Sequence, residues 1–235
     1  MVFYHLYFIA GEFFGIGIAK KLFEFNMPLE PFFACLFIFI CGISSCLSRS
    51  NLKRGLKLFL IALMLSGITV FILPLFKIEG AEIRFGILHL LSVSILLYAA
   101  LCPVLKKIPP IVGFSVFFAA YVLTSGVKDG YIGLPFLKLY LPSSFYSHYF
   151  LFPLGFHTAS FGSMDYFPIL PNLFMFLAGT YAGIYVRDGR IPKLFYKSRV
   201  PFLSFFGRHA LIVYLIHFPA IYAVLLITVT IIERI

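Results

Sequence analysis

The sequence predicts an all-α membrane protein, a polytopic bundle of about seven transmembrane helices. Hydrophobic residues make up 61% of the 235 residues and charged residues only 12%, whereas a soluble domain needs about 25% charged residues to cover its surface. The mean hydropathy is +1.01, and apolar runs long enough to cross a bilayer recur along the chain. A soluble globule of this composition would expose large apolar patches, so the lipid bilayer is an expected partner.

Seven segments approach the length of a spanning helix. The first covers residues 1–19 and is interrupted by Glu12. It begins without a charged flank, so we expect this helix to be cut short or to start at the bilayer edge. The other six cover residues 31–48, 58–76, 85–105, 108–127, 166–186 and 209 to just before Glu233. The length suits one compact domain over residues 1–235.

The charges between these segments predict how they are oriented. Residues 49–57, 106–107 and 187–208 are strongly basic, whereas residues 20–30 and 77–84 balance bases with acids. Basic loops stay in the cytosol, which places residues 128–165 outside the cell membrane. That long connection is rich in Tyr, Phe, Pro and Gly, and aromatic residues favour the headgroup region, so we expect an interfacial lid there.

The same rule accounts for most of the net charge of +10, so we do not expect a nucleic-acid partner. The four cysteines lie in or beside apolar segments and lack metal-ligand spacing. No bound metal is expected. Gly179 and Gly183 form a small-xxx-small pattern, which predicts tight packing between helices.

A few ionisable residues fall inside or at the edge of the predicted spans, where each is costly and suggests a function. They are His5, Glu12, Arg84, His89, Asp165 and His217. Counting along the helices places His89, Asp165 and His217 in the outer half of the bundle, and we expect these three to line one cavity. Structural roles stay open: Arg84 could snorkel to the interface, Asp165 could cap the helix that follows it, and the imidazoles could simply pack.

Several stretches taken together resemble one family. They are MVFYH, FIFICGISSCLSR, RGLKLFLIAL, IRFGILHLLSVS, MDYFPILPNLFMFLAGTYAG and FFGRHALIVYLIH. Nearly the whole chain resembles the bacterial and archaeal relatives of heparan-alpha-glucosaminide N-acetyltransferase, which belong to a wider superfamily of transmembrane acyltransferases. The resemblance implies an enzyme that takes an acetyl or other acyl group from cytosolic acyl-CoA. The acceptor would be an amine or hydroxyl of a sugar or glycan at the other face.

Carried over by position, the resemblance implies a catalytic set of His5, His89, Asp165, Arg84 and His217. A neutral imidazole is a suitable base near pH 7, so His89 or His5 is expected in that role. Asp165 would orient it or accept protons. Arg84 or His217 would stabilise the oxyanion. The CoA phosphates would bind cytosolic bases, with Lys53, Arg54, Lys106, Lys107 and Arg208 as candidates.

Two other classes of function fit the same composition. One is a transporter or flippase for a small solute or a lipid-linked sugar, and the other is a non-catalytic membrane protein. Transporters often show repeated halves, and no repeat is evident. Retained CoA binding would distinguish the enzyme from a transporter. Assembly with further copies of the chain is compatible with all three.

Overall fold

The computed structural model describes residues 2–76, 80–196 and 200–232. Within them, six helical stretches are long and apolar enough to cross a membrane. They are Gly17–Leu47, Asn51–Phe76, Ile87–Leu105, Pro110–Asp129, Ile169–Arg187 and Ala210–Ile232. All six uncharged runs predicted from the sequence fall on them, which confirms a predominantly α-helical, multi-pass membrane protein.

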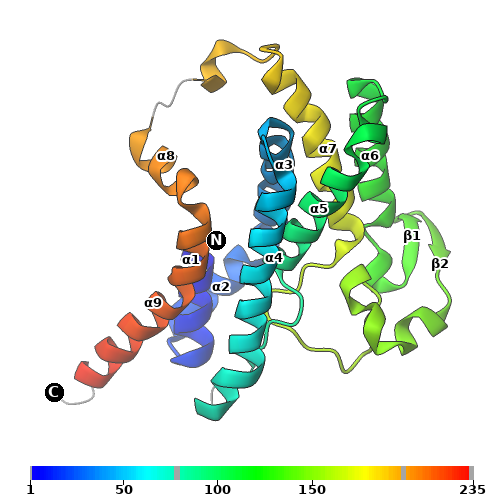
Figure 1. Ribbon diagram of the computed structural model, residues 1–235. Coiled ribbons are helices and arrows are strands. Elements are labelled where there is room, and N and C mark those ends of the chain that lie inside the picture. Colours follow the sequence, from blue (N-terminus) through cyan, green and yellow to red (C-terminus); the bar gives the residue numbers. More distant parts are fainter. Residues whose placement is uncertain (1, 77–79, 197–199, 233–235) are drawn as a thin grey trace. The chain divides into compact units, whose positions relative to one another are not determined.

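The chain separates into two compact units. The larger covers Cys35–Arg190, and the smaller combines Met1–Ala34 with Ile191–Ile235. The larger unit holds most of α3 (Glu30–Leu47) and then α4 (Asn51–Gly67), α5 (Ile87–Leu105), α6 (Pro110–Thr124) and α7 (Ile169–Arg187), drawn from blue to yellow in Figure 1.

Helices α5 and α7 form the inside of the larger unit. About half of the residues of each are buried, 50% for α5 and 44% for α7. In the stretches that begin with α4 and α6, only 11% and 17% of the residues are buried. Leu90 and Ile95 of α5 and Phe176 and Ala178 of α7 are completely buried. The outer helices keep apolar side chains exposed, among them Leu60, Met64 and Ile111, as expected for surfaces that face lipid.

Helix α7 crosses α3 at glycines, which confirms the predicted tight packing. A Cβ atom on Gly42 would lie 2.1 Å from the carbonyl oxygen of Phe176, and one on Gly179 would lie 2.2 Å from that of Phe39. A Cβ atom on Gly183 would lie 2.6 Å from Cβ of Cys46. Only glycine allows the two backbones to approach this closely.

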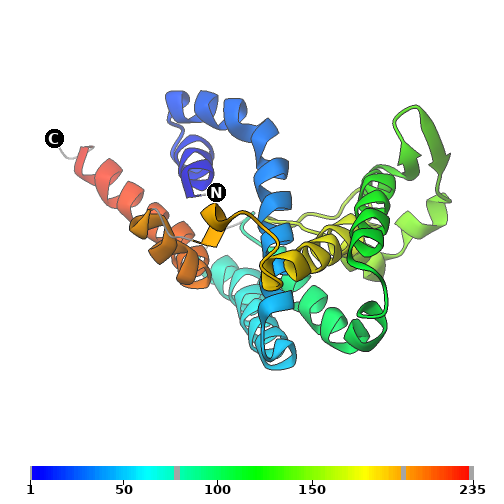
Figure 2. The ribbon, with the colours of Figure 1, turned by 90° about the horizontal axis from the view of Figure 1, so that it is seen from above.

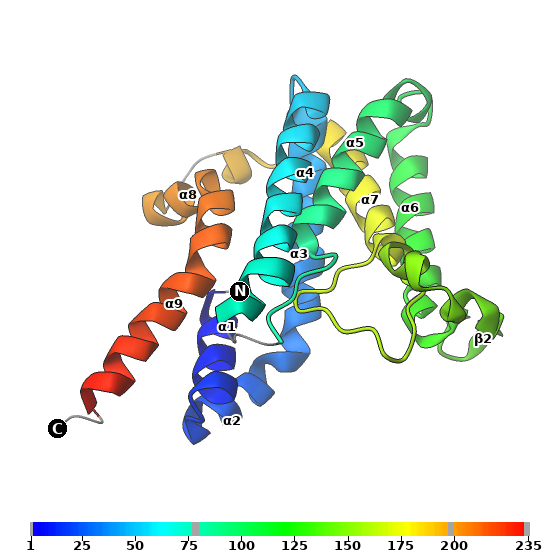
Figure 3. The ribbon, with the colours of Figure 1, turned by 60° about the horizontal axis from the view of Figure 1, so that its bottom comes forward.

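The basic loops of the larger unit lie at one end of it. The α3–α4 turn, the α5–α6 turn and the C-terminal end of α7 lie there, as Figures 1 and 3 both show. Residues 80–86 and residues 128–165 lie at the opposite end. The alternation of loop charges seen in the sequence therefore corresponds to two ends of the larger unit.

The smaller unit corrects the predicted first span. Residues 1–19 do not form one helix, because α1 (Val2–Phe8) passes into a π-helical turn (Ile9–Phe13) and the chain reverses at Gly15, which has φ of +68°. Helix α2 (Gly17–Asn26) then packs against α1. Gly11 allows this approach, since a Cβ atom there would lie 2.9 Å from Cα of Lys20. A 3₁₀ turn, Met27–Leu29, connects α2 to α3.

The C-terminal part of the smaller unit contains α8 (Pro201–Arg208) and α9 (Ala210–Ile232), preceded by a 3₁₀ turn, Lys193–Tyr196. Helix α9 contacts α1 and the π-helical turn that follows α1. This packing brings the first and last parts of the chain together.

Residues 128–165 contain regular structure that the all-α prediction did not include. After a 3₁₀ turn, Val127–Asp129, strands β1 (Tyr131–Leu134) and β2 (Leu137–Tyr140) form an antiparallel hairpin in which Tyr131 pairs with Tyr140. Two 3₁₀ turns follow, Ser143–Ser147 and Tyr149–Leu154. In Figure 2 the hairpin projects away from the helices of its unit.

Candidate active site

The residues predicted for catalysis fall into two groups, one in each unit. His5 and His217 meet in the smaller unit, on α1 and α9. Arg84, His89 and Asp165 lie in the larger unit, around the start of α5. A cavity shared by His89, Asp165 and His217 stays a prediction.

The imidazole rings of His5 and His217 are neighbours, with ring centroids 4.8 Å apart and planes inclined by 55°. Nδ1 of His5 and Nε2 of His217 are both buried and have no hydrogen-bond partner among the described residues. A buried polar atom without a partner costs free energy. Such atoms mark places where a substrate group or a water can bind.

The backbone of α9 fixes the tautomer of a neutral His217. Its Nδ1 lies 2.6 Å from the carbonyl oxygen of Tyr214 and 3.2 Å from that of Val213. A carbonyl only accepts hydrogen bonds, so Nδ1 carries the proton and donates it. The other ring nitrogen, Nε2, then holds a free lone pair in the buried space next to His5, as a general base requires.

Aromatic rings surround the pair. The Tyr4 ring meets His5 edge to face at 5.5 Å, and the Tyr214 ring lies 5.7 Å from His217. Phe218, the residue after His217, also contacts the ring of His5, at 6.2 Å. These contacts hold the imidazoles in an apolar surrounding, which strengthens any electrostatic interaction within it.

His89 differs because both of its ring nitrogens are engaged. Nδ1 accepts a hydrogen bond from the backbone N–H of Gly86 at 3.3 Å, which makes Nε2 the protonated nitrogen of the neutral ring. Nε2 then donates to the hydroxyl of Ser66 at 3.3 Å. His89 is 4% exposed. In this arrangement it closes the first turn of α5 and holds α4 against it.

Asp165 also acts at the start of α5. Its carboxylate accepts a hydrogen bond from the backbone N–H of Ile87 at 3.2 Å, so it caps α5. Its φ is +53°, a conformation that Asp tolerates better than most residues. Gly86 makes room for it, because a Cβ atom there would lie 2.7 Å from the Asp165 carboxylate.

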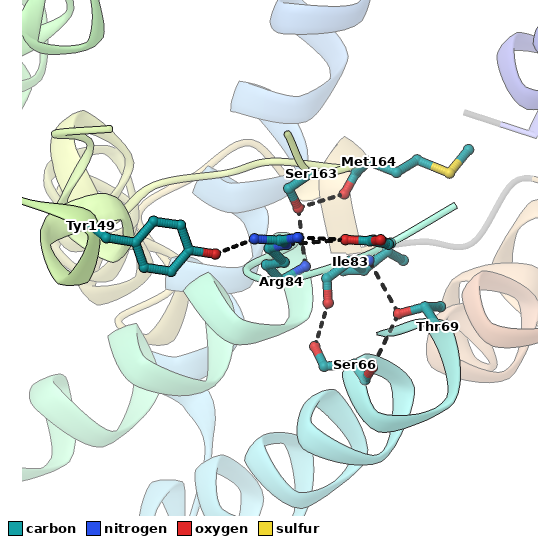
Figure 4. A network of polar contacts seen from close by, with 8 residues as sticks. Ser66, Thr69, Ile83, Arg84, Tyr149, Ser163 and Met164 are labelled. Carbon is teal, nitrogen blue, oxygen red and sulfur yellow. Dashed lines mark hydrogen bonds and ion pairs between the residues drawn. The ribbon is translucent and has the colours of Figure 1, made fainter. Parts of the chain in front are cut away.

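Arg84 is held at the surface by polar partners. Its guanidinium forms an ion pair with Glu82 at 2.7 Å and hydrogen-bonds the hydroxyl of Tyr149. The hydrogen bond to Glu82 raises the pKa of Arg84 above its ordinary value. Figure 4 shows the guanidinium of Arg84 pointing toward the hydroxyl of Tyr149.

Two serines and a threonine that were not predicted as site residues complete this network, as Figure 4 shows. Ser66 donates to the carbonyl oxygen of Ile83 at 2.5 Å, and Thr69 accepts the Ile83 N–H at 3.1 Å. Thr69 lies in a π-helical turn (Ile68–Ile72), a feature that is frequent at functional sites. In the sequence, the only indication of this network was the presence of two hydroxyl residues, Ser66 and Thr69, three positions apart in an otherwise apolar span.

The predicted CoA-binding residues occupy different positions. Lys53, Lys106 and Lys107 are exposed at the basic end of the larger unit, and none forms an ion pair within the described ranges. Arg54 is half-buried there, 3.5 Å from both the Ser45 hydroxyl and the Cys41 sulfur. Arg208 is exposed at the end of α8 in the smaller unit.

No group of three or more potential metal ligands occurs in the described part of the chain. The basic end can hold phosphates, since ammonium and guanidinium groups bind them by charge-assisted hydrogen bonds. The imidazole pair can accept and return a proton.

Comparison with known proteins agrees with this chemistry. A family model described as "Heparan-alpha-glucosaminide N-acetyltransferase, catalytic" matches residues 1–219, across both units. No curated protein and no solved structure matches the chain. The match covers most of the sequence and includes His5, Arg84, His89, Asp165 and His217, and the chain therefore belongs to the heparan-alpha-glucosaminide N-acetyltransferase catalytic family.

Proposed function

We propose that this protein is a membrane-embedded acyltransferase that moves an acetyl or other acyl group from acyl-CoA to an amine or hydroxyl of a sugar. The family supports acetyl transfer. The observation that carries the proposal is the buried pair of imidazoles with two unsatisfied nitrogens, in a chain that crosses the membrane several times.

The pair supplies the proton transfers that acyl transfer needs. His217 Nε2 takes the proton from the acceptor amine or hydroxyl as this group attacks the thioester carbonyl. The new C–N or C–O bond forms, the C–S bond breaks, and the CoA thiolate receives the proton from the imidazolium. General acid–base catalysis of this kind contributes about 10²- to 10⁴-fold in rate.

His5 is well placed to assist because its ring is in contact with that of His217. A ring N–H of His5 can donate a hydrogen bond to the oxyanion of the tetrahedral intermediate. Donors of this kind cost about 3–4 kcal/mol of activation free energy when they are removed. The two roles could also be exchanged between the rings, and both assignments require both imidazoles.

His89, Asp165 and Arg84 are assigned positioning roles. His89 and Asp165 fix the start of α5 through hydrogen bonds to the backbone of Gly86 and Ile87. Arg84 ties the segment before α5 to residues 128–165 through Ser163 and Tyr149. All three lie at the end of the larger unit that is opposite its basic loops.

The donor is proposed to bind from the opposite end. Lys53, Lys106 and Lys107 are free to contact the CoA phosphates, and half-buried Arg54 offers a guanidinium less screened by water. Arg208 on α8 is the candidate in the smaller unit. With the basic end in the cytosol, acyl-CoA would have access to it from the cytosol.

The test compares three histidines of the smaller unit. We expect His217→Ala and His5→Ala each to lower acetyl transfer from acetyl-CoA to amino sugars by about 10²-fold or more. His209→Ala is the matched control, because His209 is exposed and its ring nitrogen contacts the carbonyl oxygen of Phe205 on its own helix. All variants are purified in detergent and assayed with radiolabelled acetyl-CoA.

Acetyl-CoA binding, measured on the same preparations, separates the enzyme from a transporter or an inactive subunit. We expect His217→Ala to bind acetyl-CoA while failing to transfer the acetyl group. Turnover equal to that of the parent in both His5 and His217 variants would refute the proposed chemistry.

A further inference from the structure

The β-hairpin of the larger unit exposes an unusual amount of apolar surface. Phe136 at its tip is 84% exposed, and Leu137, Leu139 and Tyr140 of β2 are 73%, 70% and 74% exposed. An isolated two-stranded hairpin is at best marginally stable in water, and an exposed apolar edge strand invites aggregation. Something must cover this hairpin.

Backbone hydrogen bonds connect the base of the hairpin to the end of the stretch Pro110–Asp129. The Tyr131 N–H donates to the Gly126 carbonyl at 3.1 Å, and the Leu141 N–H donates to that of Gly130 at 2.9 Å. The Tyr131 ring occupies the space that a side chain on Gly126 would fill. The stretch Pro110–Asp129, long and apolar enough to cross a membrane, ends between these contacts. The base of the hairpin therefore follows directly on the end of that stretch.

We propose that this hairpin, residues 131–140, inserts its apolar side chains into the lipid headgroup region beside α6 and anchors residues 128–165 to the membrane surface. Four residues per strand reach about 14 Å, whereas one headgroup layer is about 5–8 Å thick. The tip can therefore enter either lipid or water, and its Phe and Leu side chains favour lipid.

Two features place the hairpin at the interface and not deeper. The outer edge of β2 has backbone groups without strand partners in the described sheet, and such groups need water or headgroups. Lys138 lies over the Tyr131 ring at 4.4 Å. Lys and Tyr side by side are typical of a membrane interface, where the ammonium can meet lipid phosphate and the ring the acyl boundary.

Other occupants fit less well. A sugar needs convergent hydrogen-bonding groups, and the exposed side chains of the tip and β2 are apolar except for Lys138 and the Tyr140 hydroxyl. A second copy of the chain would gain little, because a patch of four side chains falls well below the area of a stable protein interface.

The chain contains no tryptophan, so one introduced indole reports on one position. Phe136→Trp is conservative and lies at an exposed site. The variant is reconstituted into phosphatidylcholine vesicles whose acyl chains carry bromine near the headgroups or near the chain ends. We expect blue-shifted emission that is quenched most by the shallow bromines and little by aqueous iodide.

Phe118→Trp is the depth control, because Phe118 is an exposed aromatic near the middle of the same span. Its emission should be quenched most by the deep bromines. Adding Leu137→Ser and Leu139→Ser to Phe136→Trp should weaken shallow quenching and increase quenching by iodide.

Two results would overturn the proposal. If iodide strongly quenches the indole of the Phe136→Trp variant and brominated lipid does not, the hairpin lies in water. If neither reagent quenches this indole, protein covers the hairpin instead of lipid.

Discussion

His89 and His217 have similar sequence surroundings, but their hydrogen bonds leave a free ring nitrogen only on His217. Each lies within an apolar helix, and hydropathy cannot distinguish them. His89 uses one nitrogen to accept and the other to donate, so its neutral ring has no lone pair left. His217 donates from Nδ1 to its own helix and keeps Nε2 open. The difference lies in which backbone carbonyl or N–H happens to be within reach.

The structural role of His89 gives a stability prediction. We expect His89→Ala to lower the free energy of unfolding by about 1–3 kcal/mol, because it leaves the Gly86 N–H without its acceptor in a buried place. Thermal unfolding in detergent measures the change. His148→Ala is the control, since His148 is exposed beside Phe150. An unchanged unfolding midpoint together with lost acyl transfer would instead assign His89 a direct catalytic role.

The crossing of α3 and α7 shows how a helix pair in a membrane gains contact without a hydrophobic driving force. Lipid tails are as apolar as the side chains, so close packing of small residues supplies the attraction. Gly42 and Gly179 face each other across the pair, with a carbonyl oxygen next to each.

A methyl group at this crossing should force the helices apart. We expect Gly42→Ala or Gly179→Ala to destabilise the protein by about 1–3 kcal/mol or more, the cost of overpacking. Gly67→Ala is the matched control: Gly67 ends α4 with helical φ, and a Cβ atom there would meet nothing within 4 Å. That change should be neutral or stabilising by up to about 1 kcal/mol. Equal unfolding midpoints for all three variants would contradict the packing explanation.

Hydropathy predicted the six long helices because each continues for about 20 residues without a charge. It was wrong about residues 1–19, which are mostly apolar but do not form one helix. The chain reverses at Gly15, and Gly11 lets the backbone at Lys20 pack closely against it. Hydropathy also gave no sign of the hairpin, since tyrosine is typical both of strands and of membrane interfaces. Backbone geometry at glycines contributes to both cases, since Gly130, just before the hairpin, and Gly133, within it, have φ of +88° and +120°.

At the scale of the whole molecule, sequence could name the candidate residues but could not pair them. His5 and His217 lie at opposite ends of the chain, and only the packing of α1 against α9 brings their rings together. Ser66 and Thr69 were overlooked because hydroxyls in an apolar helix usually bond to their own backbone. Their further bonds to Ile83 depend on how the chain returns to α5.

The separation of charge between the two ends of the larger unit predicts its orientation in the membrane. Two exposed serines provide matched positions: Ser50 in the basic α3–α4 turn, and Ser144 within residues 128–165. We expect a membrane-impermeant maleimide to label Ser144→Cys in intact cells and Ser50→Cys only after permeabilisation, since basic loops are retained in the cytosol. The parent chain sets the background, because its four cysteines are half-buried in spanning helices. The opposite pattern would place the basic end outside, where cytosolic acyl-CoA could not reach Lys53, Lys106 and Lys107, and would require a donor other than acyl-CoA.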